Sequence, residues 1–206
     1  MPSESVIAIS KGVNTVTKNL LLFVPPIFLL VIELLFQLTV SVVPNIWLVW
    51  VGRFIVGFIG FMTYCIVVDM TNDTINGKPL NLNKSLKVIM RRLPELILVA
   101  IVAVLCALTI LLIPLAYFIR TITIIEKTDT NQTISKSVNF VRNNLGDVLV
   151  FVIITMLASF LFTFVFSLIP FFGTYVGDLL NLLVNVVFTA ASVHLYTSLK
   201  MTTPNP

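Results

Sequence analysis

The sequence predicts an all-α, polytopic transmembrane helical bundle, with six spans in three hairpins and an interfacial amphipathic helix before each hairpin. Three observations predict this fold: composition, long apolar runs, and a motif that occurs three times. Of the 206 residues, 58% are hydrophobic, only 11% are charged, and the mean hydropathy is +1.05. A soluble domain carries roughly 25% charged residues. The composition therefore excludes a soluble enzyme, a nucleic-acid-binding module and a disordered chain.

The apolar runs define the candidate spans. A span needs about 20 apolar residues to cross a hydrocarbon core of about 30 Å. Five runs qualify: Leu20–Val43, Ile46–Val68, Pro94–Ile113, Leu145–Ile169 and Phe171–Leu199. A sixth stretch, Leu115–Ile125, is apolar but short and contains Arg120. The polar start of the chain does not resemble a cleaved signal peptide, so we expect the first span to remain in the mature protein.

An internal repeat supports six spans. Three segments begin with Lys and a small residue, with apolar residues two, five and nine places after the Lys. The segments start at Lys11-Gly12, Lys84-Ser85 and Lys136-Ser137. This spacing is typical of an amphipathic helix, and an apolar run follows each time. We therefore divide the single membrane domain, 1–206, into units of about 11–68, 84–126 and 136–199.

Each predicted outgoing span ends in the same short pattern, an apolar pair followed by proline. The three tips are Val42-Val43-Pro44, Leu112-Ile113-Pro114 and Leu168-Ile169-Pro170. Proline removes a helix hydrogen bond, so a turn and a returning span are expected there. The alternative has five spans, with Pro94–Ile125 as one long kinked helix.

The basic residues favour six spans. Of 13 Lys and Arg, only Arg53 and Arg120 fall within the predicted spans, and the tips carry no charge. Six spans place the tails and both long linkers on one face, which the positive-inside rule identifies as cytoplasmic. We therefore expect a multi-pass protein of the cell membrane with N- and C-termini in the cytoplasm. The positive net charge reflects this topology rather than a nucleic-acid partner.

Four ionisable residues fall within the predicted spans, where such groups are costly and mark function by default. They are Glu33, Arg53, Arg120 and Asp178.

Glu33 and Arg53 lie at similar depth in one hairpin, which predicts an ion pair. The other two are expected to pair with each other or to join a four-charge cluster. The pairs either hold the hairpins in register or form a proton or ion relay.

Polar residues also follow one face of the last span, at spacings of three or four residues. They are Asp178, Asn181, Asn185, Thr189 and Ser192. In lipid, such a stripe must face protein or water. It either makes hydrogen bonds between helices or lines a cavity for a solute.

The second predicted interfacial helix is the most basic of the three, with Lys84, Lys87, Arg91 and Arg92. A basic amphipathic helix beside a span suits anionic lipid headgroups on the cytoplasmic side. The alternative is ordinary topology-determining charge. The sequence shows no catalytic constellation, metal cluster or phosphate-binding loop, so we expect no enzyme activity, metal or cofactor.

Several motifs resemble a group of six-span prokaryotic membrane proteins. They are Ile113-Pro114 through Arg120, Glu126, Ser135-Lys136-Ser137, Val141-Arg142-Asn143-Asn144, and Asn76-Gly77-Lys78. The group includes the membrane domain fused to some glycerophosphodiester phosphodiesterases and many uncharacterised proteins. The resemblance implies six spans. It implies no phosphodiesterase activity, because this chain lacks that domain.

Two functions follow as expectations. The first is a non-enzymatic accessory or scaffold subunit of a membrane complex, or a lipid-interacting membrane organiser. Its partners would be membrane lipids and either other membrane subunits or a second copy of itself. The alternative is a small transporter or channel for a solute or an ion, using the polar stripe on the last span.

Overall fold

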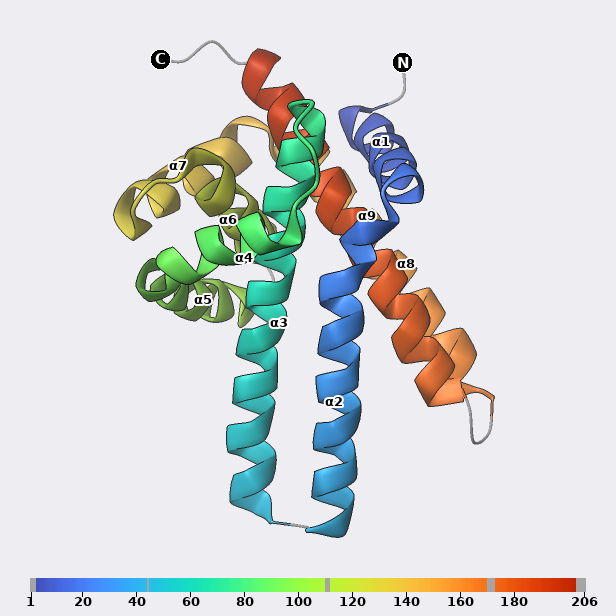
Figure 1. Ribbon diagram of the computed structural model, residues 1–206. Coiled ribbons are helices and arrows are strands. Elements are labelled where there is room, and N and C mark those ends of the chain that lie inside the picture. The colour runs from blue at the N-terminus through green and yellow to red at the C-terminus, as the bar shows by residue number, and fades with distance from the viewer. Residues whose placement is uncertain (1–2, 44, 110–111, 170–172, 203–206) are drawn as a thin grey trace.

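The computed structural model is almost entirely helical (Figure 1). The structure describes residues 3–43, 45–109, 112–169 and 173–202. These residues form nine α-helices and one 3-10 helix, which confirms the all-α class. The elements are α1 (Glu4–Lys18), η1 (Leu20–Phe23), α2 (Val24–Val42), α3 (Ile46–Ile75), α4 (Leu82–Arg91), α5 (Leu93–Ala107), α6 (Ile113–Glu126), α7 (Thr130–Asn143), α8 (Leu145–Ser167) and α9 (Gly173–Thr202).

Local sequence explains where several helices begin. The Asn81 side chain caps α4 by accepting from the backbone N–H of Lys84 at 3.0 Å, and Asp129 caps α7 through Gln132 at 3.1 Å. Proline lies in the first turn of α2, α5 and α6, where its missing N–H costs no helix bond. Pro114 thus begins α6 as predicted, whereas the tips at Pro44 and Pro170 lie outside the described residues.

Four helical segments in the described part of the chain are long and apolar enough to cross a membrane. They are Leu20–Val42, Ile46–Ile75, Leu145–Phe166 and Val176–Met201. By contrast, α5 and α6 have 15 and 14 residues, or about 22 and 21 Å at 1.5 Å per residue. Neither matches the full thickness of about 30 Å. The structure therefore has four full-length candidate spans where the sequence predicts six.

The five-span alternative does not match the helices of the second unit. It joins Pro94–Ile125 into one kinked helix, but α5 ends at Ala107, α6 begins at Ile113, and the two helices pack against each other. Figure 1 shows α5 lying across α3 rather than alongside it. Helices α5 and α6 are thus separate helices in contact, as are α2 with α3 and α8 with α9.

The helices contact one another in a cyclic pattern. Helices α3, α6 and α9, which we call the returning helices, all touch one another. The three short amphipathic helices are present, and each packs on a returning helix of the preceding unit: α4 on α3, α7 on α6 and α1 on α9. The last contact links the first unit to the third and closes the ring.

The repeated Lys-small motif explains this docking. The small residue after the Lys is buried in all three copies, at Gly12, Ser85 and Ser137. The Lys of the second and third copies binds an acidic residue on the preceding returning helix. Lys84 Nζ lies 2.5 Å from Asp73 Oδ2, and Lys136 Nζ lies 3.1 Å from Glu126 Oε2. The small residue permits close approach, and the Lys fixes the register.

The apolar residue two places after the Lys is exposed in every copy. Val13, Leu86 and Val138 are 43%, 45% and 45% exposed, while Val16 and Ile89 are buried. The predicted apolar face therefore divides between the protein core and the surface. The small residue takes the buried place because only a short side chain fits between two helices in contact.

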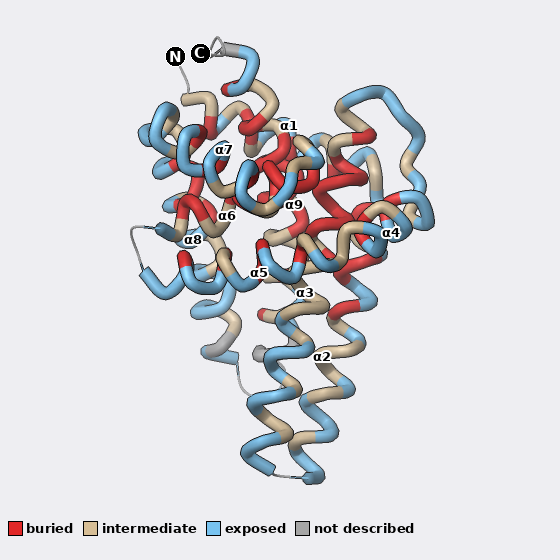
Figure 2. The backbone as a smooth tube through the Cα atoms, turned by 90° about the vertical axis from the view of Figure 1, so that its left-hand side faces the viewer, coloured by how far each residue is buried: buried red, intermediate tan, exposed pale blue. Residues whose placement is uncertain are grey.

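The buried core lies toward the end of the molecule that holds both termini (Figures 1 and 2). An aromatic cluster occupies part of it, with Phe118 of α6 5.7 Å from Phe151 of α8 and 5.2 Å from Phe140 of α7, centroid to centroid. The far halves of α2 and α3 are mostly exposed and apolar (Figure 2), Val42 at 78% and Trp47 at 75%. An apolar surface of this extent is compatible with insertion into lipid.

Replacing Gly12 with alanine is expected to lower the free energy of unfolding by about 1–3 kcal/mol, the usual cost of overpacking. A Cβ at Gly12 would lie 2.7 Å from Ala191 Cβ and 2.8 Å from the Ala191 backbone nitrogen, so α1 must move away from α9. Gly146, at the start of α8, has open space around it. Gly146→Ala is therefore the control, neutral or stabilising by up to about 1 kcal/mol. Thermal unfolding in one detergent compares them, and equal stability would contradict the tight α1–α9 contact.

Candidate functional site

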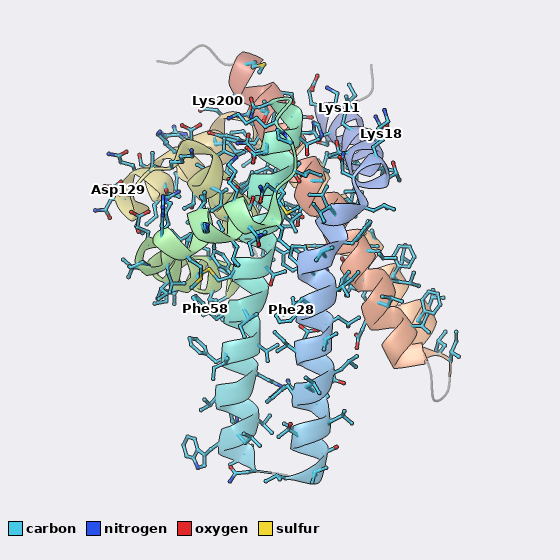
Figure 3. All side chains as sticks on the ribbon, viewed as in Figure 1. Lys11, Lys18, Phe28, Phe58, Asp129 and Lys200 are labelled. Atoms are coloured by element: carbon cyan, nitrogen blue, oxygen red, sulfur yellow. The ribbon has the colours of Figure 1, made fainter. Side chains whose placement is uncertain are left out.

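A large cavity lies between α2, α3, α5, α6 and α9. Its volume is about 1090 Å³, at the upper end of ligand pockets in proteins. It forms because α5 and α6 are short, whereas α2, α3 and α9 are long. Most of its lining is apolar and includes Phe54, Phe58, Ile101, Val104 and Leu105. Figure 3 labels Phe58 on α3.

The cavity opens at the apolar surface of the molecule. Phe54 of α3 and Val104 of α5 both line it and are 73% and 60% exposed. Charged side chains gather instead at the end that holds both termini, where Figure 3 labels Lys11, Lys18 and Lys200. The mouth between α3 and α5 is therefore bordered by side chains suited to lipid rather than to water.

All four ionisable residues predicted within the spans line this one cavity: Glu33, Arg53, Arg120 and Asp178. They converge from α2, α3, α6 and α9. The predicted ion pair between Glu33 and Arg53 is not formed, because none of the ion pairs among the described residues includes either side chain. Depth along one hairpin does not decide whether two side chains point toward each other.

Arg120 is held by aromatic rings rather than by a carboxylate. Its guanidinium carbon lies 5.2 Å from the ring centroid of Tyr64 and 5.8 Å from that of Tyr117, within cation–π range. Its Nη2 donates to Thr189 Oγ1 at 3.3 Å, and its buried Nε has no partner among the described residues. A guanidinium has five N–H donors, so Arg120 is fixed in place with donors still available.

The two carboxylates come from α2 and α9, which contact each other. Glu33 on α2 and Asp178 on α9 lie close enough for their charges to interact. Neither makes a hydrogen bond or an ion pair with any residue that the structure describes, and the same holds for Arg53. An unpaired charge at membrane depth costs several kcal/mol. Within the described chain, these three side chains are therefore available to a ligand.

The polar stripe of the last span divides in two. Asp178, Asn181, Asn185 and Thr189 line the cavity. The fifth residue, Ser192, is buried above it, where its hydroxyl lies 3.0 Å from that of Thr121 and donates to the Thr189 carbonyl at 2.7 Å. Interhelical hydrogen bonding therefore accounts for Ser192, whereas the other four side chains face the cavity.

Two of the four predicted headgroup ligands, which lie on α4 and at its end, have partners within the protein. Lys84 binds Asp73, and this hydrogen bond raises the pKa of the Lys84 ammonium. Arg92 is mostly buried and donates to the carbonyls of Thr123 at 2.8 Å and Thr128 at 2.6 Å. Lys87 and Arg91 are exposed. Only these two of the four remain free to bind lipid. Lys84 is bound to Asp73, and Arg92 lies at the α4–α5 junction and points into the protein.

Two residues that hold Arg120 in the cavity were not predicted from the sequence. Tyr117 precedes Arg120 by three residues on α6, so helical spacing was a signal for its contact, whereas Tyr64 lies on another unit and gave none. Glu126, which the sequence marked only through the family resemblance, lies outside the cavity lining. It accepts from Tyr196 at 2.8 Å and from Lys136 and Lys200, so it joins α6, α7 and α9.

Across the described ranges, no three His, Cys, Asp or Glu side chains gather closely enough to hold a metal ion. No protein-family model, curated protein or solved structure matches this chain. The resemblance drawn from its motifs therefore stays a prediction.

Proposed function

We propose that the protein is a non-enzymatic, multi-pass membrane protein that binds an amphiphilic, lipid-like molecule in the cavity between α2, α3, α5, α6 and α9. One observation carries the proposal. The cavity has an apolar lining, yet it gathers all four ionisable side chains of the predicted spans, and three of them lack a partner in the described chain. Apolar walls with a few convergent polar groups are typical of a ligand site.

Two features favour the binding of a ligand over the transport of a solute through the protein. The polar stripe ends in the buried pair of Thr121 and Ser192, and the core packs around them. A water-filled path toward the end that holds the termini would have to cross this core. The cavity opens instead between α3 and α5, where a lipid enters from the side.

Transport of a solute or an ion is the second candidate, because four of the five stripe residues line the cavity. It requires the Thr121–Ser192 contact to open. The accessory-subunit role stays a prediction that purification from the native membrane tests. A stoichiometric second protein would support it, and the protein alone with bound lipid would count against it.

We further propose the topology of three hairpins that enter the membrane from one side. The pairs α2–α3 and α8–α9 cross it, and the shorter α5–α6 pair enters only part of the way. The protein would lie in the cell membrane, with both termini in the cytoplasm. Charged side chains at the termini support this orientation, since basic segments stay on that face (Figure 3). Lys87 and Arg91 would then meet anionic headgroups at the cytoplasmic surface.

Filling the cavity is expected to remove the bound lipid. A Cβ at Gly57 on α3 meets no atom within 4 Å although Gly57 lines the cavity, so Gly57→Phe places a ring in the cavity without a clash at its base. We expect native mass spectrometry of the variant in mild detergent to show several-fold less bound phospholipid than the wild type.

Gly146→Phe is the matched control. Gly146 also has open space around it, but it does not line the cavity. The control is expected to keep the wild-type amount of bound lipid. Equal lipid in all three proteins would overturn the proposal, because the lipid would then belong to the outer surface.

A further inference from the structure

The charges of the cavity describe the polar part of its ligand. Two arginines, Arg53 and Arg120, and two carboxylates, Glu33 and Asp178, line one apolar space. No ion pair among the described residues joins either of these arginines to either of these carboxylates. The formal charges of the four side chains sum to zero, and their positive and negative groups are not paired with one another.

We infer that the ligand is a zwitterionic amphiphile whose anionic group binds the two arginines and whose cationic group binds the two carboxylates. The inference rests on the proposed function and names its ligand class. A purely anionic headgroup would leave both carboxylates unpaired at membrane depth, and a cationic one would leave both arginines unpaired. A neutral headgroup would leave all four charged side chains unpaired, at a cost of several kcal/mol each.

The arginines suit a phosphate. Arg120 is held between the Tyr64 and Tyr117 rings and uses one donor on Thr189, so further N–H groups remain for a bidentate contact. Arg53 is exposed and without a partner in the described chain. The carboxylates accept but do not donate when ionised, so an ammonium group is the matching partner.

The apolar walls place the rest of the molecule. Phe54, Ile101, Val104 and Leu105 lie along α3 and α5 at the mouth of the cavity, and all four are exposed. Acyl chains that extend through this mouth would bury these side chains. The ligand class is therefore a lipid with a phosphate and an amine in its headgroup, rather than the water-soluble headgroup alone.

Binding of three chain-labelled fluorescent lipids to the detergent-purified protein tests the inference. The probes are phosphatidylethanolamine, which is zwitterionic, phosphatidylglycerol, which is anionic, and diacylglycerol, which is neutral. We expect phosphatidylethanolamine to bind about tenfold or more tightly than diacylglycerol, a difference equal to about 1.4 kcal/mol. Soluble phosphoethanolamine at the same concentration should not displace it.

Two variants separate the two halves of the headgroup. Arg53→Gln is expected to weaken both phospholipids by about threefold to tenfold, because both carry the phosphate. Glu33→Gln is expected to weaken phosphatidylethanolamine by a similar factor and to leave phosphatidylglycerol unchanged or bound more tightly. Neither side chain has a partner in the described chain, so both variants should unfold at the wild-type temperature.

The outcomes distinguish the two proposals. If phosphatidylethanolamine and diacylglycerol bind equally, or neither variant has an effect, the zwitterionic ligand is overturned. The proposed function still stands in that case if Gly57→Phe lowers lipid binding several-fold. Displacement by phosphoethanolamine overturns the lipid class. Lipid binding that Gly57→Phe leaves intact refutes the cavity as the site, and with it the proposed function.

Discussion

Replacing Arg92 with alanine is expected to lower the free energy of unfolding by about 3 kcal/mol, since hydrogen bonds of a charged group contribute about 1.5–3 kcal/mol each. The guanidinium donates to the carbonyls of Thr123 and Thr128 at 2.8 and 2.6 Å and to Glu95 Oε2 at 2.9 Å through Nε. These bonds join the α4–α5 junction to the end of α6. Denaturant titration of the purified protein in mixed micelles measures the loss.

The neighbouring Arg91 provides the matched control, because it is exposed and has no partner among the described residues. Arg91→Ala should change stability by less than about 0.5 kcal/mol. Arg92→Lys should recover only part of the loss, because one ammonium group cannot span two carbonyls as a planar fork does. Equal effects of the two alanine variants would refute the structural role and restore Arg92 as a headgroup ligand.

Glu126→Gln is expected to cost about 1–3 kcal/mol at neutral pH, less than a fully buried ion pair because both lysines are half exposed. Burial alone would raise the pKa of Glu126. The hydrogen bonds from Lys200, Tyr196 and Lys136 outweigh it and lower that pKa to about 2. The carboxylate thus joins three helices at the end of the molecule that holds the termini.

The lowered pKa of Glu126 determines how the stability of the protein changes with pH. A carboxylate whose pKa is lower in the folded state stabilises the fold fully above its ordinary pKa near 4.5 and loses that contribution as pH falls toward 2. The difference in unfolding temperature between wild type and Glu126→Gln should therefore be full at pH 7 and shrink toward pH 3. Glu4→Gln, at the start of α1, should cost less than about 1 kcal/mol. A difference that stays constant with pH would contradict the role of the charge.

Periodicity and composition predicted the helices well, because both depend on local residue types. The three short amphipathic helices, the turn before Pro114 and the four longest candidate spans could all be located from spacing and hydropathy. The sixth apolar stretch was recognised as short. Whether α5 crosses the membrane or lies across α3 depends on its packing, which hydropathy does not contain.

The candidate site divides in the same way. The energetic cost of a charge inside a membrane predicted that the ionisable residues of the spans would be functional. These are Glu33, Arg53, Arg120 and Asp178. Helical spacing placed the polar stripe on one face of the last span. The contact partners of these residues could not be predicted from the sequence. The expected Glu33–Arg53 pair is not formed, and Arg120 is held by Tyr64, which lies on another unit. Depth along a helix is a local quantity, whereas the direction of a side chain in a bundle depends on helix rotation and crossing.

The amino-acid sequence alone determined that this chain is helical, apolar and built from a motif used three times, because propensity, hydropathy and period are properties of consecutive residues. Tertiary structure alone decided how the units close. It placed Gly12 against Ala191, paired Lys84 with Asp73 and Lys136 with Glu126, and turned Arg92 inward. It also left a cavity where α5 and α6 are short. These contacts form between separate helices and helix junctions, and only the packed bundle brings their residues within reach.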